Sequence, residues 1–297
     1  MIVIKNPPQL LNFAPEIIKC MSNLSNYTGN INIQRPELWT LQLAFHPRVL
    51  RYMLFDRQVD NSLIAGEISL DNGTDSYLKT LENAVYDNSV LLDDYGQVQL
   101  LVDTSHFVLL PPEVTDDGEA DELLRAQFPE LEGDTALCTL PRCGVKLAFE
   151  LPDGLLGFLR RTFNMAPIAH HLMPLCEYYA RFCQRSGVRR MFLNFHDERM
   201  DLVVFDRDRL QLANTFEPRN ASDAAFMALH AWQSLGMDVR GDELQFSGDK
   251  AMRDPVAQEL RRYISYVMPA IFPAAAMRLS HDAMRAPFNL ITLALCE

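Results

Sequence analysis

The residues most suited to binding or catalysis lie in two short turns, each expected between consecutive strands. The turns are His46-Pro47-Arg48 and His196-Asp197-Glu198-Arg199. A turn that binds a phosphate brings its backbone N–H groups close to the anion, and glycine is favoured there because it has no side chain. Neither turn contains glycine, Pro47 has no N–H to donate, and Asp197 and Glu198 would repel a phosphate. We therefore predict that neither turn binds a nucleotide phosphate.

Histidine and cysteine side chains could provide metal or nucleophilic chemistry at a second place. His170 and His171 are followed by Cys176 and Cys183, and these cysteines share one face of a helix expected over residues 174–184. Zinc sites usually show more closely spaced ligand pairs, and the apolar neighbours of both cysteines indicate a buried helix face. We predict no metal site and no catalytic residue. A Ser-His-Asp arrangement formed in space stays open, although no G-x-S-x-G motif supports one.

The elements that would position these residues occur twice in the chain. Residues 42–57, QLAFHPRVLRYMLFDR, align without a gap with residues 192–207, FLNFHDERMDLVVFDR, and the two segments share Leu, Phe-His and Phe-Asp-Arg at a constant offset of 150. A repeat period of 150 residues is too long for a solenoid and predicts two similar lobes. His46 and His196 occupy equivalent positions, which favours a shared structural role at the turn over catalysis.

The composition is that of a globular protein with a substantial core, since 48% of the residues are hydrophobic and 22% are charged. The net charge of −12 argues against a general nucleic-acid surface, which needs a positive field. No segment is long and apolar enough to span a membrane, and the N-terminus lacks the pattern of a secretory signal. We therefore expect a cytoplasmic protein whose six cysteines are reduced thiols.

The hydrophobic pattern predicts the order strand, strand, strand, helix, strand, helix, strand in each half. In the first half we expect strands over 39–45, 50–55, 63–70, 97–102, 107–110, 145–151 and 167–172, and helices over 76–91, 119–128, 155–163 and 174–184. In the second half we expect strands over 191–195, 200–205, 210–216, 243–247, 274–279 and 288–296, and helices over 224–235 and 255–267. This order indicates an α/β protein with mixed sheets and helices packed on them.

The duplicated layout resembles the actin-like ATPase fold, a ribonuclease H-like fold shared by actin, the 70-kDa heat-shock chaperones and the sugar kinases. Three segments are also similar to an uncharacterised Bacteroidetes family, domain of unknown function 3822. They are FDRDRLQLANTFEPRNASDAAFMALHAW, LQFSGD with the following helix ELRRYISYV, and the C-terminal PFNLITLALCE. The pattern along the chain predicts an N-terminal leader over 1–37, a first lobe over 38–187 and a second lobe over 188–297, and the resemblance to the actin-like fold covers most of residues 38–297. The similarity to the Bacteroidetes family implies no activity, because that family has none established.

The resemblance also places both turns where actin-like proteins hold nucleotide phosphates between their lobes, usually with Asp-x-Gly and further Gly or Thr. Asp71-Asn72-Gly73-Thr74 matches that signature, but it follows the third strand and is interpreted as a turn and helix start. Asn194 lies where the second phosphate motif often has an acid, and Ser247-Gly248-Asp249 resembles the glycine-bearing turn near the adenosine. The candidate residues of the cleft are His46, Arg48, Asn194, His196, Asp197, Ser247, Gly248 and Asp249.

We favour a non-enzymatic binding or adaptor protein that recognises a protein partner or a small ligand in the interlobe cleft and needs no cofactor. Actin-like proteins that act as adaptors in secretion and pilus assembly support this by analogy only. The alternative is a nucleotide-dependent phosphotransferase or ATPase, with ATP at Ser247-Gly248-Asp249 and magnesium on Asp103 or Asp197. A scaffold without any ligand is the third hypothesis. The missing glycines in the two turns separate the first hypothesis from the second.

Overall fold

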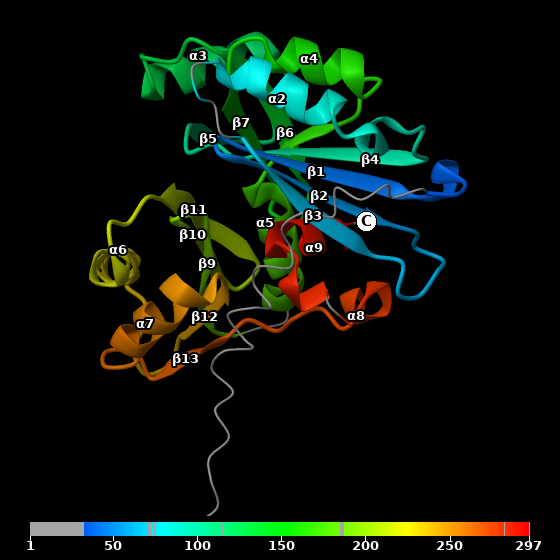
Figure 1. Ribbon diagram of the computed structural model, residues 1–297. Helices are drawn as coiled ribbons and strands as arrows, with labels where there is room; N and C mark the ends of the chain where they lie inside the picture. The colour runs from blue at the N-terminus through cyan, green and yellow to red at the C-terminus, as the bar shows by residue number, and fades with distance from the viewer. Residues whose placement is uncertain are drawn as a thin grey trace, which may run out of the picture.

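The computed structural model describes residues 33–70, 73, 75–114, 116–184, 187–281 and 283–296. Most of the predicted leader lies outside these residues, as does most of the Asp71-Asn72-Gly73-Thr74 segment. The described residues form two sheet-based lobes, with the first sheet at the upper right of Figure 1 and the second at the lower left. The lobe boundaries after residues 37 and 187 stay predictions.

The first lobe is built on a five-stranded sheet with the order β3-β2-β1-β4-β8. Its strands are β1 (Thr40–His46), β2 (Val49–Phe55), β3 (Ile64–Ser69), β4 (Gln97–Val102) and β8 (Ile168–His170). β1, β2 and β3 form an antiparallel meander, and β4 pairs parallel with both β1 and β8. One face of β1 buries Leu41, Leu43 and Phe45 in a core shared with helices α2 (Tyr77–Tyr86) and α4 (Leu155–Thr162).

The second lobe repeats this plan in the order β11-β10-β9-β12-β13. Its strands are β9 (Arg189–His196), β10 (Arg199–Asp206), β11 (Arg209–Phe216), β12 (Glu243–Gly248) and β13 (Tyr266–Pro269). Helices α6 (Ala221–Ser234) and α7 (Lys250–Leu260) cover the face that buries Met191, Leu193 and Phe195. The matching strand orders and pairing directions confirm the predicted duplication and the mixed α/β class.

Helix α5 (Leu172–Cys183) lies between the two sheets, as Figure 1 shows. Its apolar residues belong to the same core as Phe192, Val203 and Phe205 on the inner face of the second sheet. The ring of Tyr179 stacks on that of Phe192 with a centroid separation of 3.9 Å. The start of α5 therefore places the side chain that precedes it, His171, at the junction of the lobes.

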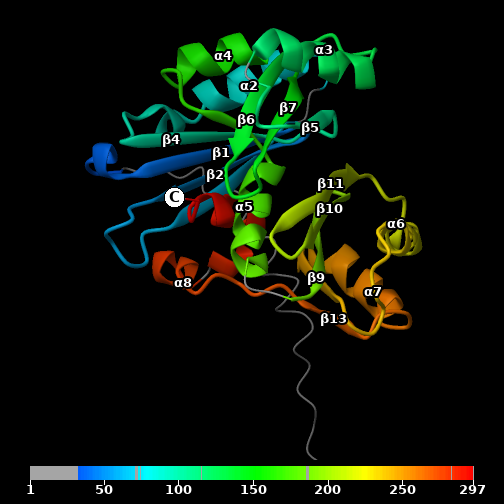
Figure 2. The same ribbon diagram turned by 180° about the vertical axis from the view of Figure 1, so that it is seen from behind.

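A segment between β4 and β8 forms a second layer in the first lobe. It contains β5 (Phe107–Leu110), α3 (Asp117–Gln127), β6 (Asp134–Leu140), β7 (Val145–Leu151) and α4. The strands form a three-stranded antiparallel sheet, β5-β7-β6, that lies below α3 and α4 in Figure 2. The sequence analysis did not predict β6, whose residues are mostly half-buried and show no clean alternation.

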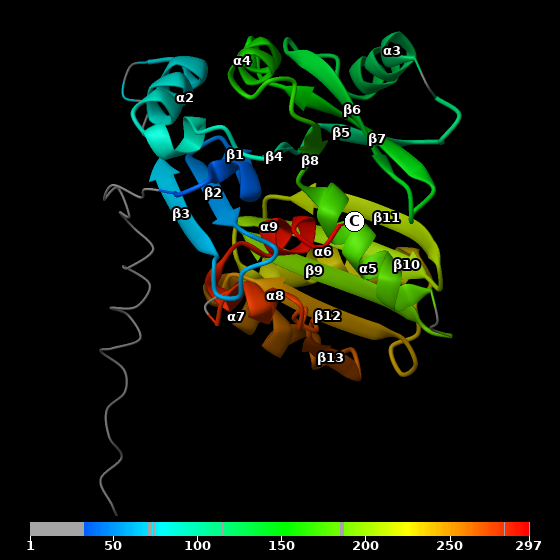
Figure 3. The same cartoon turned by 90° about the vertical axis from the view of Figure 1, so that its right-hand side faces the viewer.

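The end of the chain differs from the prediction. The expected strands over 274–279 and 288–296 are helices α8 (Ala276–Leu279) and α9 (Phe288–Leu293), and the expected helix over 255–267 begins at Lys250 and ends before β13. A short, uninterrupted apolar run cannot be assigned to strand or helix by its periodicity, which explains the error at α9. Figure 3 shows α9 beside α5, and it packs against the face of the first sheet that carries Ala44, Met53 and Leu101.

Short 3-10 helices complete the described structure: η1 (Pro36–Leu38), η2 (Ser89–Leu92) and η3 (Ala283–Arg285). Among the described residues, every helix is too short or too polar to cross a lipid bilayer.

Candidate functional site between the lobes

The two turns of the sequence repeat face each other across the junction of the lobes. Arg51 on β2 donates through both Nη atoms to the Asp197 carboxylate in the β9–β10 turn. Arg199 on β10 donates from Nη1 to Asp103, which follows β4, at 2.9 Å. Each lobe thus contributes an arginine to a carboxylate of the other. We call these residues and their histidine neighbours the interlobe cluster: His46, Arg51, Asp103, His171, His196, Asp197, Arg199 and Asp201.

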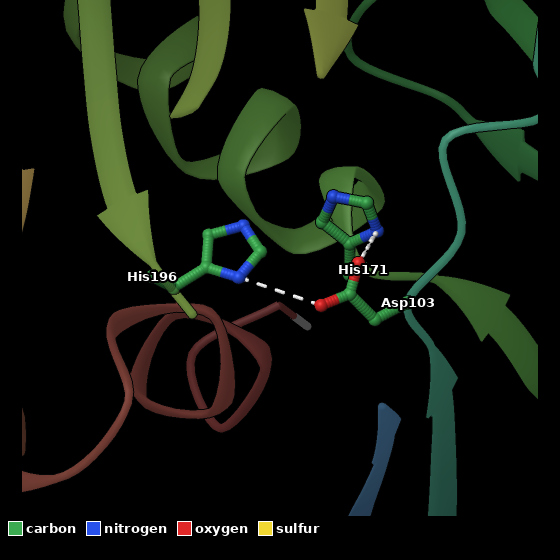
Figure 4. A group of neighbouring side chains, drawn as sticks. All are labelled: Asp103, His171 and His196. Atoms are coloured by element: carbon green, nitrogen blue, oxygen red, sulfur yellow. Dashed lines mark ion pairs between the residues drawn. The ribbon is translucent and has the colours of Figure 1, made fainter. Parts of the chain in front are cut away.

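Asp103 lies at the centre of the interlobe cluster. The N–H of Asp103 donates to the carbonyl of Phe45 at 2.9 Å, which extends the pairing of β4 with β1 and fixes the residue at the sheet edge. Its carboxylate lies 3.3 Å from Nδ1 of His171 and 3.4 Å from Nδ1 of His196, as Figure 4 shows. Burial by itself would raise the pKa of Asp103, but the charges of His171, His196 and Arg199 hold it well below its usual range.

Asp201 holds the other side of the two imidazoles. Its Oδ1 lies 3.0 Å from Nε2 of His171, and its Oδ2 lies 2.9 Å from Nε2 of His196. Asn194 and Thr215 also donate to this carboxylate, at 3.1 and 2.9 Å. Burial opposes ionisation of Asp201, yet the neighbouring histidines keep its pKa below the usual range. Two buried carboxylates therefore enclose His171 and His196.

The histidines differ in their surroundings. Burial lowers the pKa of His46, whose Nδ1 accepts from the N–H of Arg48 at 3.2 Å. Burial acts in the same direction on His196, but the charges of Asp201 and Asp103 outweigh it and raise its pKa well above the usual value. His46 and His196 are therefore equivalent in the sequence repeat but not in their electrostatics.

The structure brings together four of the predicted cleft residues at the interlobe cluster and its border: His46, Arg48, His196 and Asp197. Arg48 is exposed and lies 3.5 Å from Glu198. Asn194 connects to the same network through Asp201 and accepts from the Ser247 hydroxyl at 2.9 Å. Both are buried.

Gly248 and Asp249 lie at the edge of this network and have structural explanations. Gly248 has φ +86°, and a Cβ there would lie 2.0 Å from the carbonyl oxygen of Phe195, so β12 can end so close to β9 only with glycine. Asp249 is exposed and caps α7 by accepting from the N–H of Ala251 at 3.0 Å.

The sequence analysis considered His171 only with its neighbours along the chain. Cys176 and Cys183 are buried in the apolar core around α5, as predicted, and His170 contacts the carbonyl of Thr104 at 2.9 Å. His171 instead meets Asp103 and His196, and one donor atom from each of the three lies within 4.8 Å of the others. His46, Asp103 and Asp197 meet the same criterion. These groups come from separate elements, so no spacing in the sequence indicates them.

Two further residues were missed for the same reason, although each carries a local signal. Asp201 interrupts an apolar strand, and a charged residue on a buried strand face needs partners. Arg51 likewise interrupts the mostly apolar strand β2. Their partners, which make them part of the interlobe cluster, are visible only once the lobes are placed together.

A pocket of about 620 Å³ opens beside the interlobe cluster. Its walls are the two turns and the adjoining ends of β2, β3, β10 and β11, and they carry charges of both signs. The lining residues are His46, Pro47, Arg48, Val49, Arg51, Glu67, Ser69, Asp197, Glu198, Arg199, Glu217 and Pro218.

Solved structures with similar folds support the actin-like assignment. A Bacteroides thetaiotaomicron protein with actin-like ATPase fold and unknown function superposes with a TM-score of 0.76 at 20% identity, covering 91% of this chain and 100% of that chain. The PilM-PilN type IV pilus biogenesis complex gives a TM-score of 0.50 at 12% identity, covering 87% and 98%.

The search of curated proteins gave no match. The strand order, the duplicated lobes and the similar solved structures together establish the actin-like ATPase fold. Residues 28–267 match the family described as protein of unknown function, DUF3822, and the chain therefore belongs to that family.

Proposed function

We propose that this protein is a non-catalytic binding or adaptor protein, acting in the cytoplasm, that recognises a protein partner or a small ligand at the pocket between its lobes. One observation carries the proposal. The second turn is engaged with side chains of the first lobe across the junction, by the pairs of Asp197 with Arg51 of β2 and of Arg199 with Asp103, which follows β4. A phosphate entering between the turns would have to displace these pairs.

The backbone of the second turn also argues against phosphate binding. Asp197 and Glu198 both adopt left-handed φ values, of 46° and 63°, where glycine would be the unstrained residue. Both side chains are carboxylates, and the Arg51 guanidinium keeps the pKa of Asp197 below its usual range against the effect of burial. The charge that could attract a phosphate is thus already balanced.

The alternative of a nucleotide-dependent enzyme finds little support in the residues it would need. Magnesium prefers oxygen ligands in octahedral geometry. Around Asp103 the neighbouring groups are instead the Arg199 guanidinium and three imidazoles, and Asp197 is held by Arg51. Gly248 packs against the backbone of Phe195, which explains the glycine without a nucleotide.

The pocket has the character of a polar recognition surface. Arg48 and Glu198 stand at its rim with side chains 81% and 83% exposed, and Glu67 and Glu217 add negative charge along the walls. Charges of both signs suit a partner segment or ligand that also carries both. The pilus complex of PilM and PilN shows that a protein of similar fold can assemble with another protein, which supports the proposal by analogy.

The enzyme alternative is tested by the melting temperature with and without millimolar Mg·ATP. A ligand present at a hundred times its dissociation constant stabilises the folded state by about 2.7 kcal/mol. We expect no upward shift. A clear shift in melting temperature that is reversed by dialysis would contradict the proposal and make hydrolysis assays the next measurement.

The binding role is tested at the rim of the pocket. We expect the variants Arg48→Glu and Glu198→Arg to reduce retention of the native partner or ligand on the immobilised protein, because they reverse exposed charges without touching the core. The double variant restores an ion pair across the rim but still presents the charges in exchanged places, so it should not recover binding. Arg278→Glu is the matched control, since Arg278 is 71% exposed and pairs with Asp60 away from the pocket. Equal retention by all four variants would contradict recognition at this pocket.

A further inference from the structure

We propose that Asp103, His171 and His196 bind a divalent first-row transition metal ion, zinc or a chemically similar ion, at the junction of the lobes. The proposal concerns a site buried behind the pocket and does not depend on whether a partner is recognised there. It rests on the positions of the donor atoms, on the contacts of the two imidazoles with Asp201 and on the charges around them.

The spacing of the donor atoms is compatible with coordination of one ion, with His171 opposite one oxygen of Asp103 and His196 opposite the other. Nδ1 of His171 lies 3.3 Å from Oδ1 of Asp103, and Nδ1 of His196 lies 3.4 Å from Oδ2. A charge-assisted N–H···O bond is shorter, at about 2.7–2.9 Å. Ligands that lie about 2.0–2.1 Å from a tetrahedral zinc ion are about 3.3–3.4 Å from one another. Nδ1 of His171 is fully enclosed and forms no hydrogen bond.

Asp201 orients both imidazoles toward Asp103. Its two oxygens lie within 3.0 Å of Nε2 of His171 and within 2.9 Å of Nε2 of His196, respectively. A metal-binding histidine commonly directs its other ring nitrogen to a carboxylate, which places the proton on that nitrogen and the lone pair on the metal side. With Nε2 of each ring on Asp201, both Nδ1 atoms face Asp103. Neutral rings in this arrangement would direct lone pairs at carboxylate oxygens, and a cation between them removes the repulsion.

The hydrogen bonds of His46 exclude it from the same ligand set. Its Nδ1 accepts from the N–H of Arg48, so the neutral ring has its proton on Nε2, the atom that lies 3.9 Å from Asp103. It presents a donor to the carboxylate and no lone pair for a metal ion. His46 therefore supplies a nearby control for the two proposed ligands.

The local charges leave room for a cation. Three enclosed carboxylates, Asp103, Asp197 and Asp201, stand against the two guanidinium groups of Arg51 and Arg199, so one further positive charge balances them, supplied by a proton on His196 or by a metal ion in its place. Two nitrogen donors and one carboxylate suit a zinc-like transition ion, whereas magnesium and calcium favour oxygen donors alone. Three protein ligands also leave a coordination position for water or for a group of a bound ligand. The competing arrangement is a purely ionic one, in which protons rather than a metal occupy the imidazole nitrogens.

The test is metal binding by the full chain. Metal content is measured by mass spectrometry on protein purified without chelator. Protein stripped with EDTA is then titrated with Zn²⁺, with Co²⁺ and, under anaerobic conditions, with Fe²⁺. The visible absorption of Co²⁺ reports its coordination. We expect one ion per chain. Affinity should fall at least about tenfold in His171→Gln, His196→Gln and Asp103→Asn, and by about 10–100-fold in Asp201→Asn, which only orients the ligands.

Two controls keep the result unambiguous. His46→Gln should retain the metal affinity within about threefold. Circular dichroism of each stripped variant shows whether it is folded. If a change at the fully buried His171 prevents folding, His196→Gln replaces it as the ligand variant. Comparison of Zn²⁺ with Fe²⁺ identifies the preferred ion. Absence of binding, or weak binding that is equal in the wild type and in folded ligand variants, would overturn the proposal in favour of the protonated, metal-free arrangement.

Discussion

Replacement of Arg51 by methionine should destabilise the protein substantially, because it leaves Asp197 without its partner at the junction of the lobes. Arg51 reaches Asp197 with both Nη atoms, and its Nε lies 3.4 Å from Glu67. The two main partners are 22% and 15% exposed, so solvent screens them only in part. Removal of one member of a fully buried ion pair costs about 3–5 kcal/mol.

The structure narrows the range expected for the loss in free energy of unfolding. Two charges about 4 Å apart interact by about 4 kcal/mol at an effective dielectric constant of about 20, the value appropriate near a protein surface. The remaining exposure of Arg51 and Asp197 lowers this, and methionine recovers some apolar contact in place of the arginine stem. We therefore expect Arg51→Met to lower the free energy of unfolding by about 2–3 kcal/mol.

The measurement is urea-induced unfolding followed by circular dichroism, with the double variant Arg51→Met/Asp197→Asn completing the cycle, since Asn tolerates the left-handed φ of this position. Two uncharged residues in place of the pair should restore much of the stability, because no charge is then left unpaired. Arg278→Met is the matched control: its pair with Asp60 is 71% and 65% exposed, and such pairs contribute less than about 1 kcal/mol. An effect of Arg51→Met no larger than that of the control would refute the reasoning that this pair holds the turns together.

Two further predictions concern other parts of the fold. Gly248→Ala should lower the free energy of unfolding by about 2–4 kcal/mol, because it combines a left-handed backbone with a Cβ 2.0 Å from the Phe195 oxygen. Gly187→Ala, with open space around it, should change the free energy of unfolding by less than about 0.5 kcal/mol in the same urea experiment. Burial raises the pKa of Glu177, although its carboxylate accepts from the N–H of Arg142 at 2.9 Å. A raised pKa in the folded state makes ionisation destabilising. Glu177→Gln should therefore be more stable than the wild type at pH values above the ordinary glutamate range, and this advantage should disappear in acid. A difference in unfolding free energy between the two proteins that does not change with pH would contradict the raised pKa.

The parts of the fold that depend on local pattern were predictable from the sequence. The strands of both meanders are alternating or buried apolar segments separated by short polar turns, and the repeat fixed which turns correspond. The errors fall where pattern is ambiguous. The apolar run of α9 is uniform because it is enclosed between α5 and the first sheet, and a uniformly buried segment has no periodicity to distinguish helix from strand.

The candidate site was predictable only in part, for a physical reason. His46, His196 and Asp197 were found because a turn in an internal repeat draws attention to its own residues. Asp103 was named only as a magnesium ligand of the alternative reading, and His171 only with cysteines that belong to the core. Their meeting depends on how β4, α5 and β9 converge, and the sequence contains that only through the tertiary packing of both lobes.

The internal repeat itself accounts for the closed junction. Arg48 and Glu198 occupy equivalent positions in the two copies of the hairpin, with opposite charges, and they lie 3.5 Å apart across the lobes. Arg51 and Asp201 are also equivalent and opposite in charge, and each is bound by a residue from beyond its own meander. Two copies of one hairpin that both carried glycine and positive charge would repel each other and leave a space suited to an anion. Two copies with complementary charges attract, so the junction is stabilised by the residues that line it. This is the physical basis on which we favour recognition at the surrounding pocket over phosphate chemistry between the turns.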